Sequence, residues 1–137
     1  MLANGATLSY KEHNSEGNYT NLPGLKEIPD IGVDPEKVDN TCLTDANKVY
    51  EKGIGDLPDM VYRFKYDNTS AGSPYRVMRQ YDADGTLLDF KETLKDGSTT
   101  AFTAQVSVKR TGGSVNGVID FELAMTVQSQ FTYTDPA

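Results

Sequence analysis

Two segments near the C-terminus alternate apolar and polar residues, and this pattern constrains the fold more than any other feature of the chain. In Phe102–Lys109 and again in Ile119–Gln128, every second side chain is apolar or small. A period of two places those side chains on one face of a β-strand. Such a face must be covered by a second sheet or by a helix. The sequence therefore predicts a mainly β fold, an antiparallel β-sandwich or partial barrel.

Three further segments predict strands that complete this fold. Met60–Tyr66 alternates strictly, whereas Thr7–Glu12 alternates weakly and Leu88–Leu94 is a shorter mixed run. Asp96-Gly97 follows the last of these runs and is typical of a two-residue hairpin turn. We therefore expect most of the second half of the chain to be antiparallel strands joined by short turns.

One short α-helix is predicted over about residues 74–82. Ser73 is a residue type that caps helices, and Pro74 suits the first helical position. Gly85 is expected to end the helix. The aromatic and methionine side chains within this segment are spaced to share one face, so the helix is expected to lie over the sheet.

A long loop is predicted over about residues 29–58, which are rich in proline and glycine. Prolines confine strands in this part of the chain to the stretches between them, such as 25–28 and 37–43. Local propensity favours a short helix at 45–53, followed by a turn at 53–58. Long ordered loops in small domains tend to be functional, so we expect this one to make contacts.

Composition limits the class of protein. The 137 residues fit one domain, 1–137, and the excess of 20 acidic over 13 basic residues gives a formal charge of -7. Such a charge argues against binding nucleic acid by neutralising phosphates. The lone Cys42 needs no oxidising compartment, and no apolar run reaches the ~20 residues of a membrane helix. The first residues lack the features of a secretory signal, so folding in a cytosol is expected.

Two motifs resemble ligand-binding loops, and both fail on spacing. Asp82–Gly85 resembles the start of a calcium loop, but aligning its glycine puts Gln80 first and Lys91 where a bidentate glutamate belongs. Gly53–Gly55 begins like a dinucleotide fingerprint, but Pro58 stands where the third glycine is required. A helix-ending turn and an ordinary loop are the favoured interpretations.

Catalytic constellations are also missing from the sequence. His13 is the single histidine and has no nucleophile elbow to serve, and one histidine with one cysteine cannot close a zinc site. Asp120 and Glu122 share a strand face and could in principle form an acid/base pair, but a solvated polar face is the favoured interpretation. We therefore expect no enzyme activity, no metal and no cofactor.

A domain without catalytic residues works through its surface, which leaves two hypotheses. In the first, open strand edges and the long loop join copies of the chain into an assembly. In the second, the chain is a monomeric β-sandwich module that recognises a sugar or a peptide through its tyrosines. The tyrosines in question are Tyr50, Tyr62, Tyr66, Tyr75 and Tyr81.

The run Gly53–Asp67 resembles the major tail proteins, or tail tube proteins, of long-tailed bacteriophages. The likeness lies in a turn glycine, an aspartate three residues on at Asp56, an alternating strand, and a closing Tyr-Asp before a capped helix. It continues through Tyr75–Tyr81 and into Phe102–Lys109 and Gly117–Val127. The resemblance covers about two thirds of the chain.

The resemblance implies a structural virion protein whose subunits form hexameric rings. The rings would stack around a tape-measure protein, meet tail-tip and terminator proteins at the ends, and later conduct DNA without binding it specifically. Assembly would take place in the host cytoplasm, with no membrane involved. An acidic lumen wall would keep DNA phosphates from adhering, in line with the net charge.

Two sets of candidate residues follow from this resemblance. Loop residues expected to reach the adjacent ring are Asp45, Asn47, Lys48, Tyr50 and Asp56. The polar sides of the last two strands are expected to line the lumen, because their opposite sides are uniformly apolar. The candidates on these polar sides are Gln105, Ser107, Asp120 and Glu122.

Overall fold

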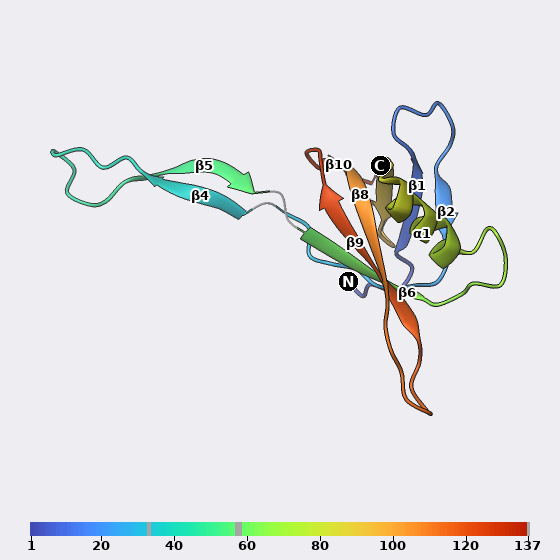
Figure 1. Cartoon of the computed structure of the whole chain (residues 1–137). Helices are drawn as coiled ribbons and strands as arrows, with labels where there is room; N and C mark the ends of the chain where they lie inside the picture. The colour runs from blue at the N-terminus through green and yellow to red at the C-terminus, as the bar shows by residue number, and fades with distance from the viewer. Residues whose placement is uncertain (33, 57–58, 137) are drawn as a thin grey trace.

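A computed structural model describes residues 1–32, 34–56 and 59–136 and consists of a curled antiparallel sheet, one helix and a projecting hairpin (Figure 1). The main sheet has the order β2-β1-β7-β8-β9-β6-β3, with β10 beside β8, and β4 and β5 pair separately. The elements are β1 (Thr7–Glu12), β2 (Thr20–Leu22), β3 (Leu25–Glu27), β4 (Asp34–Asp39), β5 (Tyr50–Asp56), β6 (Asp59–Lys65), α1 (Pro74–Asp84), β7 (Leu88–Thr93), β8 (Thr99–Arg110), β9 (Asp120–Val127) and β10 (Thr132–Thr134).

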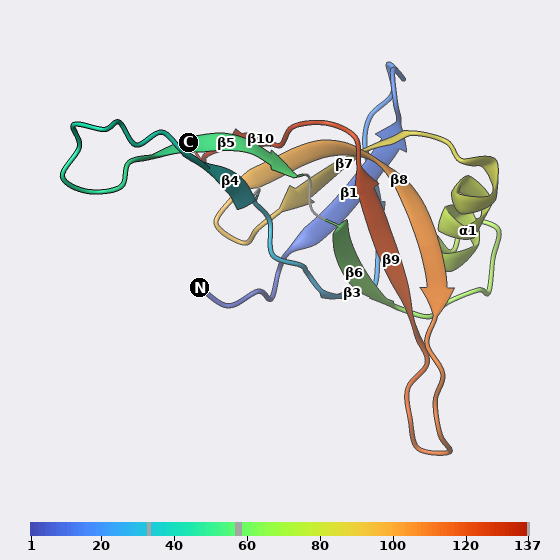
Figure 2. The same cartoon turned by 60° about the vertical axis from the view of Figure 1, so that its left-hand side comes forward.

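The predicted mainly β fold with a partial barrel and one helix is confirmed. A single sheet curls into a half-barrel, and its concave face encloses the core (Figure 2). Phe64 and Phe121 stack with ring centroids 5.3 Å apart, and Tyr75 of α1 meets the edge of Phe121 at 5.5 Å. The largest fully buried side chains are those of Tyr62, Phe64, Phe90, Phe121, Leu8, Met60, Met78, Leu88, Leu123 and Met125.

The alternating runs lie where their periodicity predicts. Across β6, β9 and β8, Tyr62, Leu123 and Val108 are register partners and point into the concave side, where the first two are fully buried. Their polar neighbours point the other way. Burial on one face is therefore the physical cause of the period-two pattern.

β8 changes its neighbours halfway along its length. From Thr99 to Ala104 it pairs with β7, and β10 lies on its other side. From Ala104 to Arg110 it pairs with β9, while Asp82 near the end of α1 contacts the side that β7 has left. The second half of β8 is thus the edge of a four-stranded unit, β3-β6-β9-β8.

The predicted helix is confirmed, with its end at Asp84. Ser73 is extended (φ -62°, ψ 138°), Pro74 opens the helix, and Gly85 ends it with a left-handed φ of 68°. The Gly85 N–H donates to the Tyr81 carbonyl at 2.9 Å. The Ser73 hydroxyl oxygen accepts the backbone N–H of Ser70 (3.1 Å), so this residue holds the preceding loop.

The hairpin turn at Asp96-Gly97 is present, but it contains three residues, not the predicted two. The Leu94 N–H donates to the Ser98 carbonyl at 2.9 Å, which closes the loop around residues 95–97. Gly97 has a φ of 94°. A turn followed by a left-handed glycine is the usual form of a three-residue hairpin loop.

The short helix predicted at 45–53 is wrong, because the region predicted as a long loop contains the antiparallel hairpin β4–β5. Asp45, expected to cap that helix, accepts the backbone N–H of Cys42 at 2.7 Å and so forms a turn. The Val49 N–H donates to the Thr41 hydroxyl at 2.8 Å across the hairpin. Residues 53–56 of the predicted turn belong to β5, while 57 and 58 lie outside the described residues. Cross-strand pairing outweighs local helix propensity here.

The carboxyl group of Glu92 lies inside the core. Glu92 of β7 is 3% exposed, and the Tyr62 hydroxyl donates to its Oε2 at 3.1 Å. Burial raises the pKa of Glu92 above its ordinary value of 4.5, and the hydrogen bond from Tyr62 offsets only part of that effect. Burial, and then the Glu92 charge, raise the pKa of Tyr62. Folding therefore shifts the titration of Glu92 towards its protonated form.

This carboxyl group predicts a pH dependence of stability. An acid whose pKa is raised by folding contributes stability below its unfolded pKa, and that contribution is lost as the pH rises through the folded pKa. In the wild type, Glu92 should therefore lower the free energy of unfolding as the pH increases from about 4.5. Denaturant titrations at several pH values should show that Glu92→Gln lacks this decrease. Glu16→Gln, on the exposed β1–β2 loop, should retain it; equal pH profiles for both variants would contradict the assignment.

Candidate assembly surfaces

The β4–β5 hairpin, here called the arm, projects away from the main sheet (Figures 1 and 2). Its strands pair with each other and form a sheet separate from the main one. Isolated two-stranded hairpins are marginally stable in water. Apolar side chains of the arm are nevertheless exposed: Val38 (47%), Leu43 (107%), Val49 (42%) and Tyr50 (51%). These features are typical of a segment that packs against another subunit.

The residues predicted to contact an adjacent ring all lie on this arm. Asp45, Asn47 and Lys48 are exposed in the loop at its outer end. Tyr50 begins β5, and Lys37 of β4 places its Nζ 5.9 Å from the centroid of that ring. Asp56 ends β5, where its backbone pairs with Asp34 at the base of the arm. Asp56 therefore lies at the base of the arm, whereas the other four predicted residues lie at or near its outer end.

The second surface is the face of β6, β8 and β9 that points away from the core, here called the outer face. The four predicted lumen residues share it. Gln105 and Ser107 are exposed on β8 opposite Thr126 and Ala124 of β9. Glu122 is two residues before Ala124 on β9, and Asp120 is two residues before Glu122, so both carboxylates point to the same side.

Both carboxylates are engaged in ion pairs. Lys26 of β3 places its Nζ 3.0 and 3.1 Å from the two carboxylate oxygens of Asp120, whose side chain is 7% exposed. Arg63 of β6 reaches Glu122 at 3.3 Å and Asp120 at 4.0 Å, and its Nε lies 3.9 Å from Glu27. Arg63 could have been found from its place on the polar side of an alternating strand. Lys26 lies on the three-residue strand β3, which is too short to show an alternating pattern, so the sequence does not indicate on which face its side chain lies.

The outer face is charge-balanced, which differs from the acidic wall expected from composition. Three acidic and three basic residues of β6, β8 and β9 point to this side among the described residues. The net charge of -7 therefore resides elsewhere on the chain. These charged residues are Asp59, Arg63, Lys65, Lys109, Asp120 and Glu122.

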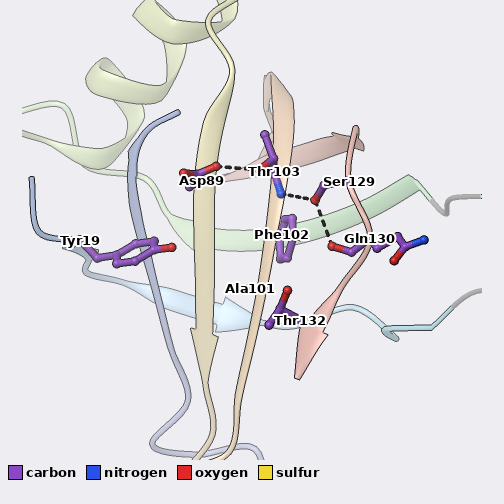
Figure 3. A pocket seen from close by; sticks show the side chains of 8 residues that line it. All are labelled: Tyr19, Asp89, Ala101, Phe102, Thr103, Ser129, Gln130 and Thr132. Atoms are coloured by element: carbon purple, nitrogen blue, oxygen red, sulfur yellow. Dashed lines mark hydrogen bonds between the residues drawn. The ribbon is translucent and has the colours of Figure 1, made fainter. Parts of the chain in front are cut away.

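A small cavity of about 250 Å³ lies against β7 and β8 (Figure 3). Burial raises the pKa of Asp89, but hydrogen bonds from Thr103 (2.6 Å) and His13 (2.8 Å) hold it below its ordinary value. The Ser129 hydroxyl accepts the Thr103 backbone N–H at 2.8 Å and donates to the Gln130 carbonyl. These polar groups are engaged with one another, which does not favour the sugar- or peptide-binding hypothesis. No group of three or more metal-ligating side chains occurs among the described residues.

Comparison with known protein families decides between the two hypotheses. A family model described as phage tail tube protein, TTP, matches residues 11–136. The chain belongs to the phage tail tube protein family. The resemblance found in the sequence is therefore confirmed, and this tail tube protein is a structural component of the virion tail. No curated protein matches the sequence. None of the described helices is long and apolar enough to cross a bilayer.

Solved structures share the fold of this tail tube protein at low sequence identity. The tail of an empty gene transfer agent particle, refined with C6 symmetry, matches with a TM-score of 0.68 and 22% identity over 93% of this chain and 95% of that one. The SPP1 tail tube matches with a TM-score of 0.63 and 10% identity, over 95% of this chain and 76% of that one. A chain of the six-fold symmetrised anti-feeding prophage baseplate matches with a TM-score of 0.68 and 9% identity, over 95% of this chain and 92% of that one.

Proposed function

We propose that this tail tube protein, acting as the single domain 1–137, forms six-membered rings that stack into a hollow tube, with the arm joining successive rings. The proposal rests on the arm, which forms a sheet separate from the main one and exposes apolar side chains that a second subunit would bury. Six-fold symmetry is supported by the gene transfer agent tail and by the anti-feeding prophage baseplate.

The ring closes through the four-stranded unit β3-β6-β9-β8, whose two edges differ. Joining the β3 edge of one subunit to the β8 edge of the next is a head-to-tail contact, which generates a closed ring when each step rotates the chain by one sixth of a turn. Six copies give about 24 strands, which at ~4.8 Å spacing and ~36° tilt form a barrel of roughly 45 Å backbone diameter. That width admits a hydrated DNA duplex.

The outer face lines the lumen, and its charge balance suits the passage of DNA. Lys26 and Arg63 are held by Asp120 and Glu122, so these two cations are less available to phosphates, and acidic and basic residues are equal in number on this face. The wall therefore neither binds nor strongly repels DNA. The same lumen would hold a tape-measure protein before DNA enters, and tail-tip and terminator proteins would close the two ends.

Electron microscopy of negatively stained protein tests this function. Concentrated protein, supplied with tail-tip initiator proteins, should form hollow filaments with a regular axial repeat. Compact particles alone, under conditions in which the initiator is incorporated, would contradict the proposal. A lumen much narrower than a DNA duplex would contradict the assignment of a conduit.

A further inference from the structure

The free edge of β8 carries an unusual contact with the helix. Beyond Ala104, β9 occupies one side of β8, and the C-terminal end of α1 reaches the other at Asp82. On that side the backbone N–H of Val108 donates to the Oδ2 of Asp82 at 3.0 Å. Close by, the Gln105 side-chain amide donates to the Gly85 carbonyl at 3.0 Å. A helix carboxylate thus occupies the position where a neighbouring strand would supply a carbonyl oxygen.

Asp82 stands at a position that helix energetics disfavours. It lies in the last turn of α1, which contains no basic residue, and Asp84 stands two residues further on. The C-terminal end of a helix carries partial negative charge, so carboxylates there are unfavourable. A residue that breaks a local preference usually serves another contact. Here that contact is the charge-assisted hydrogen bond to β8.

We propose that Asp82 caps the β8 edge of the isolated subunit and delays its pairing with a second copy of this chain. The inference rests on the proposed ring, in which this edge meets the β3 edge of the neighbour. On ring closure a backbone carbonyl of the neighbour takes over the Val108 N–H, and the Asp82 carboxylate turns to solvent. Natural sheets blunt their edges with charged side chains in the same way.

The cap acts on the first contact between subunits more than on the finished tube. A single side-chain hydrogen bond resists the first strand pair, whereas a complete run of backbone pairs and the contacts between rings outweigh it. The cap should therefore lengthen the lag before tubes appear while leaving the tubes themselves unchanged. Subunits would accumulate in soluble form until a tail tip provides a template.

Assembly kinetics of three variants test the cap. Without initiator, Asp82→Ala should shorten the lag in light scattering by about tenfold or more, as expected for the loss of one hydrogen bond to a charged group. Asp82→Asn keeps a neutral acceptor and should fall between this variant and wild type. Asp84→Ala removes a charge from the same turn and should match wild type. A lag for the two Asp82 variants that equals or exceeds that of Asp84→Ala would overturn the proposal.

Hydrogen exchange on the soluble subunit separates the cap from the proposed function. The Val108 amide should exchange faster in both Asp82 variants than in wild type, and unchanged exchange would overturn the cap. If wild-type protein forms no tube even with initiator, the proposed function fails, whereas the Val108 measurement still decides whether Asp82 protects the edge. If Asp82→Ala does not fold, the comparison of Asp82→Asn with Asp84→Ala decides both questions.

Discussion

Replacing Leu43 by aspartate is expected to give a folded subunit that builds no tube. Leu43 is fully exposed near the outer end of the arm, so the isolated subunit has no packing to lose there. In the proposed stack the same side chain is buried against the next ring. Burying a leucine contributes about 1.5–3 kcal/mol, and a buried unpaired carboxylate is strongly unfavourable. The loss is repeated at every arm of a ring and should abolish stacking.

Thermal unfolding tests whether the variant subunit is folded, and negative-stain microscopy tests whether it forms tubes. The Tm should equal that of the wild type, and filaments should be absent even with tail-tip initiator. Leu43→Met is the matched control, because it preserves side-chain volume and apolar character and should form normal tubes. Normal tubes from Leu43→Asp would remove the end of the arm from the interface between rings.

Neutralising Asp120 and Glu122 together is expected to make DNA adhere to the tube. Asp120→Asn with Glu122→Gln removes the main partners of Lys26 and Arg63, so two cations per subunit become available to phosphates. Binding through phosphates is independent of sequence and falls steeply with salt. DNA ejection from phage particles carrying this variant should therefore be slower, and added salt should restore its rate.

Conservative replacements are needed because Asp120 is buried beside two cations. A lysine at this position would stand next to Lys26 and Arg63 and would cost ~3 kcal/mol or more, as for other broken buried pairs. Asparagine leaves Lys26, which is 41% exposed, free to reach water. Glu16→Gln with Asp84→Asn removes the same number of charges away from the outer face and should eject DNA normally. Equal ejection rates for the two double variants would contradict the lumen assignment.

The parts of the fold that could be predicted are those recorded in local sequence patterns. β6, β8 and β9 are buried on one face, which imposes period-two alternation on their residues. α1 is delimited by Ser73, Pro74 and Gly85, whose conformational preferences act locally. Local patterns do not predict the arm, because residues 45–53 have helix-compatible propensity and the pairing of β5 with β4 overrides it.

The candidate surfaces were predictable in position but not in charge. Alternation places Gln105, Ser107 and Glu122 on one face, since every second residue of adjacent strands shares a side. Lys26, the nearer partner of Asp120, is 94 residues away in sequence and lies on β3, which joins the sheet by long-range pairing with β6. Composition gives the sum of charges, whereas only the register shows which charged residues share this face.

A cryo-electron microscopy map of tubes assembled from this chain tests the central claim most directly. The map should show rings in which Gln105, Ser107 and Glu122 point into the lumen and the loop at the end of each arm lies against the next ring. A tube in which these three side chains face the exterior, or in which every arm folds back on its own subunit, would contradict the claim.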